Sequence, residues 1–196
     1  MEKIIEIDTN IFLWLNNLGH ESMDSFWLIL TEKWTSIPLY MILVLLVFLK
    51  WGWRGTLICL LLVTLMITIS DQSSSFSKYF FERKRPCGED FIAEGRFIAK
   101  RCGNFGFFSA HASSTLAVAI LFGKLLKPFY PKLIYILIFW SITVSFSRIY
   151  IGVHYPTDIL AGWLVGLVLG VSFYYLHIYA FKKLDLQKKS YHVSTA

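Results

Sequence analysis

Residues 159–180 read ILAGWLVGLVLGVSFYYLHIYA and contain no Asp, Glu, Lys or Arg. A helix needs roughly 20 mostly apolar residues to cross the hydrocarbon core of a bilayer, so this stretch predicts a membrane-spanning helix. The whole chain has the same character, because 56% of its 196 residues are hydrophobic and only 16% are charged. A soluble domain carries about a quarter charged residues. The sequence therefore predicts an integral membrane protein, with residues 1–196 forming one domain.

Further apolar stretches precede this one. The predicted spans are about Trp34–Trp53, Thr56–Ser70, Ser109–Leu126, Leu133–Ile151 and Ile159–Ala180. The second span is expected to continue as helix through the polar residues Asp71–Ser77. Residues 1–35 hold two shorter apolar segments, about Ile4–Leu15 and Met23–Leu30, which predict interfacial or re-entrant helices. The predicted fold class is all-α, a polytopic transmembrane helical bundle of about five to six spans plus short N-terminal interfacial helices.

Basic residues cluster in every second connection, which means between the first and second spans, between the third and fourth spans, and after the fifth span. They are Lys50 and Arg54, then Lys124, Lys127 and Lys132, then Lys182, Lys183, Lys188 and Lys189. With five spans these clusters share one face, which the positive-inside rule makes cytoplasmic, and residues 182–196 form a basic cytoplasmic tail. This pattern explains the net charge of +6 without a nucleic-acid partner. The polar stretch 78–108 falls on the other face although it carries seven Lys or Arg against four Asp or Glu, so its basic residues need another role.

Aromatic residues near the span ends, including Trp51, Trp53 and Tyr150, predict interfacial belts. Cys59 lies inside the second span and is expected to be a small apolar residue.

The non-cytoplasmic face collects polar residues from four helix ends. They are Lys78, Arg85, Ser109, His111, Arg148, His154 and Asp158. Ionisable groups are costly in a membrane and mark functional sites by default. Guanidinium groups bind phosphoryl oxygens through paired hydrogen bonds, and a lysine adds a compact positive charge. Ser109 is placed to cap a helix whose free N–H groups would face the same anion. The set predicts a phosphate-binding site.

The histidines and the aspartate suit phosphoryl transfer. A neutral His154 can attack phosphorus through one ring nitrogen, while Asp158 holds the other ring N–H and stabilises the charge that develops. His111 can protonate the leaving oxygen. A set with one carboxylate lacks the oxygen ligands that Mg²⁺ or Ca²⁺ prefers, so we expect no metal and no cofactor.

Three motifs carry these residues in order. They are Lys78-x6-Arg85-Pro86, Ser109-Ala110-His111 and Ser147-Arg148-x5-His154-x3-Asp158. Over about residues 70–165 they resemble the signature of the type 2 phosphatidic acid phosphatase family, which vanadium haloperoxidases share. The resemblance implies metal-independent hydrolysis at a site facing away from the cytoplasm, here the periplasm or exterior of a bacterial cytoplasmic membrane. It implies that His154 is the nucleophile, His111 the general acid and Asp158 the partner of His154. The phosphate would be bound by Lys78, Arg85, Arg148, Ser109 and the Ala110 backbone.

The second motif departs from the common Pro-Ser-Gly-His, because Phe108 and Ala110 replace the Pro and Gly. Loss of the Gly puts in question how closely the backbone at Ala110 approaches a phosphate. Cys87 and Cys102 both lie in the polar stretch, so they are candidates for a disulfide in an oxidising compartment.

A lipid phosphate is the expected substrate. Undecaprenyl diphosphate is the first choice because the resemblance is to small bacterial members of the family, while phosphatidylglycerol phosphate, phosphatidic acid and lipid A phosphates stay open. A vanadate-dependent haloperoxidase is disfavoured by the membrane spans, since those relatives are mostly soluble. A catalytically dead lipid-binding protein is disfavoured by the intact catalytic positions. Membrane lipids are expected partners, and no obligatory protein partner is predicted.

Overall fold

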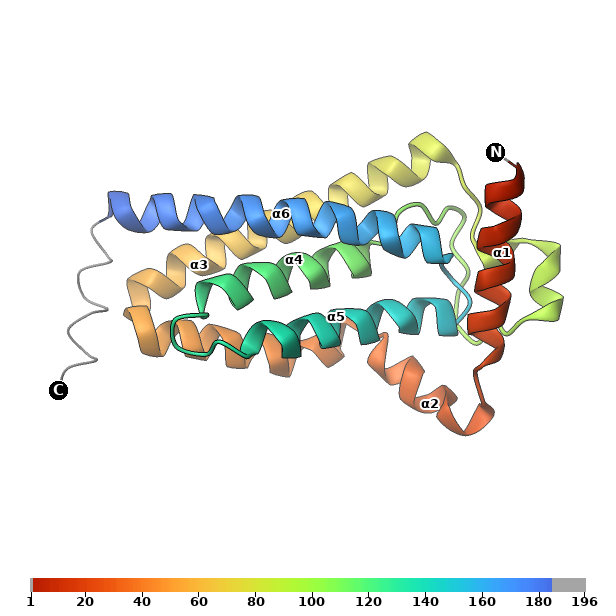
Figure 1. The fold of residues 1–196 in the computed structure, drawn as a ribbon, viewed down its shortest axis with the longest axis horizontal. Coiled ribbons are helices and arrows are strands. Elements are labelled where there is room, and N and C mark those ends of the chain that lie inside the picture. The colour runs from red at the N-terminus through yellow and green to blue at the C-terminus, as the bar shows by residue number, and fades with distance from the viewer. Residues whose placement is uncertain (1, 185–196) are drawn as a thin grey trace.

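The computed structural model describes residues 2–184, and every regular element in that range is a helix (Figure 1). One isolated antiparallel bridge pairs Lys84 with Phe105. The α-helices are α1 (Glu2–Asn17), α2 (Glu21–Leu30), α3 (Ile37–Phe81), α4 (Ala110–Leu125), α5 (Leu133–Tyr150) and α6 (Pro156–Lys183), and short 3-10 helices cover Lys33–Ser36, Pro86–Gly88 and Asp90–Glu94. The all-α prediction is confirmed. Most of the predicted basic tail, with Lys188 and Lys189, lies outside the described residues.

The first two predicted spans are the two arms of α3. Gly52 interrupts the helix with a positive φ of 64°, and the chain reverses there (Figure 1). The first arm begins at Ile37 rather than at the predicted Trp34, because Trp34 belongs to the preceding 3-10 helix and a proline stands in the first turn of α3. The second arm runs to Phe81, somewhat beyond the predicted extension through Ser77. Its length carries Lys78 to the polar end of the bundle.

Helix α4 is the centre of the bundle. Ten of its sixteen residues are buried, and it lies between α5, α6 and α3 (Figure 1). Three glycines of α6 face it at four-residue spacing: Gly162, Gly166 and Gly170. A methyl group at Gly162 would come within 2.6 Å of the Ser109 carbonyl oxygen, so the two backbones are in direct contact. Such small-residue stripes let membrane helices pack closely. The start of α4 lies deeper in the bundle than the neighbouring ends of α5 and α6 (Figure 1).

The outer faces of the bundle are apolar. Large side chains such as Leu61, Phe139 and Leu164 are more than 60% exposed. Three helical segments are long and apolar enough to cross a membrane, namely Lys33–Phe81, Leu133–Tyr150 and Pro156–Lys183, and α4 is a shorter apolar helix. A soluble monomer rarely exposes apolar surface on this scale. The protein is an integral membrane protein.

The two ends of the bundle differ in character. The Gly52 bend, the α4–α5 connection and the end of α6 lie at one end, which therefore holds those members of the predicted basic clusters that the structure describes (Figure 1). The chain between α3 and α4 lies at the opposite end, together with α1 and α2 (Figure 1). Helix α1 runs across that end rather than along the bundle. Its Asn16 side-chain amide donates to the carbonyl oxygens of Ile149 and Tyr150 at 2.9 and 3.0 Å, which fixes α1 to the end of α5.

The three predicted belt residues differ in burial, and Trp51 is only half-buried. Tyr150 is buried, its hydroxyl lies 2.8 Å from Asp24 Oδ1, and its ring stacks on Trp27 of α2. The interfacial prediction for Tyr150 is wrong because α2 folds back over the end of α5. Trp51 packs edge-on against Phe181. Trp53 is 65% exposed, as a belt residue should be, and Cys59 is buried among apolar side chains, as expected.

Candidate active site

The polar end of the bundle contains a cavity of about 510 Å³, which we call the catalytic cavity. Six of the eight predicted catalytic and phosphate-binding residues line it: Lys78, Arg85, Ala110, His111, Arg148 and His154. They come from the end of α3, the chain that follows it, the first turn of α4, the last turn of α5 and the α5–α6 connection. Ser109 and Asp158 are fully buried and are not part of the lining. The helix ends thus bring together residues that are far apart in the sequence.

His154 lies in the tight connection between α5 and α6. Gly152 makes that connection possible, because its φ is 85° and an added methyl group would lie 2.7 Å from the Arg96 carbonyl oxygen. The His154 ring is buried, and its Nδ1 lies 3.3 Å from Asp158 Oδ2. Since Asp158 occupies Nδ1, the ring nitrogen left to react is Nε2.

The surroundings of His154 favour its neutral form. Burial lowers the pKa of His154 well below its usual value, and the positive charges of Arg148, Arg85 and Lys78 lower it further. The Gly106 carbonyl group acts in the opposite direction as a hydrogen-bond acceptor. A neutral imidazole keeps the lone pair that a nucleophile needs.

Asp158 is held rigidly behind His154. It stands at the third position of α6, where its Oδ2 accepts a hydrogen bond from the Tyr155 backbone N–H at 3.0 Å. Its Oδ1 accepts a hydrogen bond from Arg83 Nη1, also at 3.0 Å. A buried carboxylate is stable only when its oxygens are satisfied in this way. The helix start and the salt bridge together fix the orientation of the carboxylate toward His154.

Arg83 and Asp8 are the residues that the motifs do not reveal. In the sequence Arg83 is one of the unspecified positions between Lys78 and Arg85 of the first motif. In the structure it bridges Asp158 and Asp8 of α1. The available signal was Asp8 itself, a carboxylate inside an apolar segment, since a buried charge requires a partner.

Two arginines present donors at the catalytic cavity. Arg85 Nε donates to the Phe105 carbonyl oxygen at 3.0 Å and its Nη1 to the Val153 carbonyl oxygen at 3.5 Å, which leaves Nη2 for another acceptor. Arg148 Nη1 donates to Thr31 Oγ1 at 2.6 Å. Its Nε is buried and has no hydrogen-bond partner among the described residues. A bound anion would satisfy such a donor, and an arginine can offer two parallel hydrogen bonds to a phosphoryl group.

The first turn of α4 presents His111 and Ala110 to the same cavity. Ser109 is the N-cap, and its side chain accepts from the Ala112 N–H at 3.5 Å. Its predicted contact with phosphate stays a prediction, because the hydroxyl faces the helix and the residue does not line the cavity. The free N–H groups of this helix end still point toward the space where an anion would lie.

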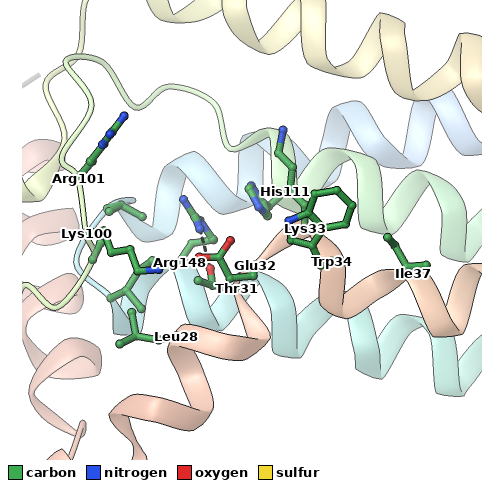
Figure 2. Close-up of a pocket in the computed structure, with 13 residues that line it drawn as sticks. Leu28, Thr31, Glu32, Lys33, Trp34, Ile37, Lys100, Arg101, His111 and Arg148 are labelled. Carbon is green, nitrogen blue, oxygen red and sulfur yellow. Dashed lines mark hydrogen bonds between the residues drawn. The ribbon is translucent and has the colours of Figure 1, made fainter.

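A second cavity of about 590 Å³, which we call the side cavity, adjoins the first (Figure 2). The two share five lining residues: Thr31, Glu32, Lys33, His111 and Arg148. Trp34, Lys100 and Arg101 line the side cavity only, whereas His154 lines the catalytic cavity only. Figure 2 shows Glu32 and Lys33 beside Arg148 and His111, with the Trp34 ring next to them. The segment after α2 therefore forms part of the wall, which the sequence motifs do not indicate.

Cys87 and Cys102 are joined in a disulfide, and their Cα atoms lie 5.9 Å apart. The bond spans the chain between α3 and α4, close to Arg85 on one side. It constrains the segment that brings Arg85 and the start of α4 to one cavity.

Comparison with known proteins agrees with this geometry. The PAP2 superfamily model matches residues 55–182. A lipid A 4'-phosphatase of Porphyromonas gingivalis is 37% identical over 92% of this chain and 77% of its own length, and one of Bacteroides thetaiotaomicron is 31% identical over 90% and 79%. An undecaprenyl-diphosphatase of Sulfolobus acidocaldarius is 35% identical, over 53% of this chain and 49% of its own.

Solved structures show the same fold. The chain resembles a transmembrane PAP2 type phosphatidylglycerolphosphate phosphatase from Bacillus subtilis with a TM-score of 0.71 and 22% identity, covering 93% of this chain and 88% of that one. It resembles LpxE of Aquifex aeolicus with a TM-score of 0.65 and 20% identity, covering 84% and 93%. With its three motifs gathered around one cavity, this chain belongs to the PAP2 superfamily.

Proposed function

We propose that the protein is a membrane phosphatase that hydrolyses a phosphate monoester on the sugar head group of a lipid A-type lipid. The reaction would pass through a phosphohistidine intermediate. The observation that carries the chemistry is His154, neutral and buried against Asp158, at the wall of a cavity lined by four cationic side chains, those of Lys33, Lys78, Arg85 and Arg148. Such a site combines a nucleophile with electrostatic stabilisation of the transferring phosphoryl group.

The reaction follows in two balanced steps. His154 Nε2 forms a bond to phosphorus while the bond from phosphorus to the lipid oxygen breaks, and His111 gives that oxygen a proton. A water molecule then attacks phosphorus, gives its proton to His111, and releases inorganic phosphate and free His154. The helix dipole disfavours a cationic His111 at the start of α4, so the bound dianionic phosphate is what stabilises its acid form. Lys78, Arg85 and Arg148 would hold the phosphoryl oxygens in both steps.

The comparisons and the side cavity support a lipid A-type substrate over the undecaprenyl diphosphate expected from the sequence. The two lipid A 4'-phosphatases match at least 90% of this chain, whereas the undecaprenyl-diphosphatase matches about half. A sugar head group is wider than a polyprenyl diphosphate and needs room beside the reacting phosphate. The side cavity offers that room, with an aromatic face at Trp34 and hydrogen-bonding groups at Glu32 and Lys33.

Undecaprenyl diphosphate remains the second candidate, favoured by the relative from Sulfolobus acidocaldarius. The test is phosphate release by purified protein in detergent, with lipid A, undecaprenyl diphosphate, phosphatidylglycerol phosphate and phosphatidic acid as parallel substrates. We expect the largest kcat/KM for lipid A, and His154→Gln serves as the inactive control. A larger kcat/KM for undecaprenyl diphosphate would overturn the substrate assignment while leaving the chemistry in place.

We further propose five membrane spans, counting the two arms of α3 separately, with the catalytic cavity facing the periplasm or exterior. The basic residues at the opposite end support this orientation through the positive-inside rule. Single cysteines introduced at Lys127 and at Glu94 would test it, on a background with serine at the native cysteines. A membrane-impermeant thiol reagent applied to intact cells should label the cysteine at 94 and spare the one at 127.

A further inference from the structure

We propose that Asp8 of α1 and Arg83 form a positioning pair that sets the orientation and the effective charge of Asp158, and through Asp158 the reactivity of His154. This inference rests on the phosphohistidine chemistry proposed above. It extends the machinery to a helix that carries none of the three motifs.

The geometry forms one continuous chain of contacts. Arg83 donates through Nη1 to Asp158 Oδ1 at 3.0 Å and through Nη2 to Asp8 Oδ2. Its guanidinium carbon lies 4.0 Å from the centre of the Tyr155 ring, which supports the group from one side. One guanidinium group is thus shared by two carboxylates, of which only Asp158 contacts His154.

Asp8 is built into this position. It is 3% exposed, and its Oδ1 accepts the Thr157 backbone N–H at 3.1 Å at the start of α6. Removing a carboxylate from water is costly unless it gains partners of this kind. A role limited to docking α1 would need only the contact with Thr157. The additional salt bridge to Arg83 brings a second negative charge to the residue that holds Asp158.

The charge balance explains what the second carboxylate does. Alone beside Asp158, Arg83 would neutralise that carboxylate and weaken its attraction for the positive charge that develops on His154. With Asp8 present, Arg83 is already paired, and Asp158 keeps more of its negative charge for His154. Nearby opposite charges act on an ionisable group in this way.

His154 also faces other charged and titratable groups. They are Asp158 on α6, Arg148 on α5, His111 on α4, Lys78 on α3, and Arg85 in the chain after α3. The positive groups among them make protonation of His154 unfavourable. Any change of charge at Asp8 or Arg83 therefore acts on top of an electrostatic field that is already positive at His154.

Neither member of the pair lines the catalytic cavity or the side cavity. Substitution should therefore change kcat and leave KM close to that of the wild type. Asp8 also lies outside residues 55–182, the region that the superfamily model covers. Arg83 lies inside that region, but neither Asp8 nor Arg83 is one of the specified positions of the three motifs.

The experiment measures kcat, KM and the pH dependence of kcat/KM for lipid A in Asp8→Asn, Arg83→Gln and the double variant. Asp8→Asn keeps an oxygen for the Thr157 N–H but removes the charge. We expect its kcat to fall on the order of 10- to 100-fold, the scale found for second-layer partners of metal-bound histidines. The acidic limb of its pH profile should move to lower pH, because without the negative charge of Asp8 the charge of Arg83 makes the field at His154 more positive.

Arg83→Gln should move the acidic limb the other way, to higher pH, and the double variant should return it toward the wild-type position. Arg83→Lys, which keeps the charge, should leave the limb in place while lowering kcat. A purely structural role would lower the folded fraction in every variant without opposite displacements of the limb. Glu6→Gln and Lys84→Gln are matched controls, because both side chains are exposed and lie within two residues of the pair.

Unchanged kcat and coincident pH profiles in folded Asp8→Asn and Arg83→Gln would overturn the positioning role while the wild type remains active. A wild-type protein that releases no phosphate from any lipid of the panel would instead overturn the proposed function. The two failures are therefore distinguishable.

Discussion

Gly162→Ala should show how closely the chemistry depends on the contact between α6 and α4. The added methyl group would lie 2.6 Å from the Ser109 carbonyl oxygen and 3.1 Å from the Ala112 Cβ atom. Ordinary contacts begin at 3.4 Å, so the Ser109 contact must open by 0.8 Å. Ser109 cannot move aside as a flexible side chain would, because the atom concerned belongs to the backbone at the start of α4.

The displacement affects the helix starts that position His111 and His154, the two histidines proposed to carry the chemistry. Ser109 begins the helix that carries His111, and Gly162 follows Asp158 by about one turn of α6. A misplacement of about 1 Å can lower a rate by about 100-fold. We therefore expect kcat to fall on the order of 10- to 100-fold. Overpacking should also destabilise the fold by about 1–3 kcal/mol.

The assay is phosphate release in detergent together with a thermal unfolding curve. Gly170→Ala provides a comparison on the same stripe, because its methyl group would lie 2.8 Å from the Ala117 carbonyl oxygen, two turns farther from the site. It should lose stability with a smaller loss of kcat. Gly88→Ala is the matched control, since nothing lies within 4 Å of the added atom. A Gly162→Ala protein with the kcat and melting temperature of the wild type would refute the argument.

Three further outcomes follow from the site. His154→Ala should abolish phosphate release, whereas Asp158→Asn should keep a small residual activity, because loss of the partner of a catalytic histidine lowers kcat about 10⁴-fold in a serine protease. Near-normal phosphate release by His154→Ala would contradict the mechanism. Activity should persist in EDTA and be inhibited by vanadate, which mimics the trigonal-bipyramidal transition state; a strict requirement for added Mg²⁺ would contradict the assignment of roles. Cys87→Ser should raise KM and loosen the chain between α3 and α4, since closing a loop of this length stabilises it by about 3 kcal/mol. Peptide mass mapping of fully active protein provides the check. Free, alkylatable thiols at Cys87 and Cys102 in that protein would show that the bond is not needed.

Much of the fold follows from local properties of the sequence. Apolar runs of sufficient length define the α3 arms, α5 and α6, and Gly52 lies where the predicted first span ends. The packing of α2 cannot be predicted from local properties of the sequence. Tyr150 has the sequence context of any aromatic residue at a span end, and only the tertiary structure shows that Trp27 of α2 covers it. That contact joins residues more than 100 positions apart, and no local pattern records it.

The site likewise contains residues that the sequence identifies and residues that only the tertiary structure reveals. The motifs identify the residues that line the catalytic cavity because phosphate chemistry restricts residue type at fixed spacing. They do not identify Arg83, whose partner Asp8 comes from 75 residues earlier in the chain. They also place Ser109 among the phosphate-binding residues, a role that stays a prediction, because its hydroxyl caps the start of α4 and the residue does not line the cavity. Residue type is visible in a sequence, but the direction of a side chain depends on the tertiary packing.

The shortness of α4 determines where a lipid must go. Its 16 residues measure about 24 Å at 1.5 Å per residue, less than the roughly 30 Å thickness of the hydrocarbon core. The start of α4 also lies deeper in the bundle than the neighbouring ends of α5 and α6 (Figure 1), so we expect His111, in its first turn, to lie below the level of the surrounding lipid phosphates. A lipid substrate would then have to sink toward it out of the plane of its neighbours. A thinner bilayer shortens that descent, so the thickness of the membrane itself becomes one of the variables that set the rate of turnover.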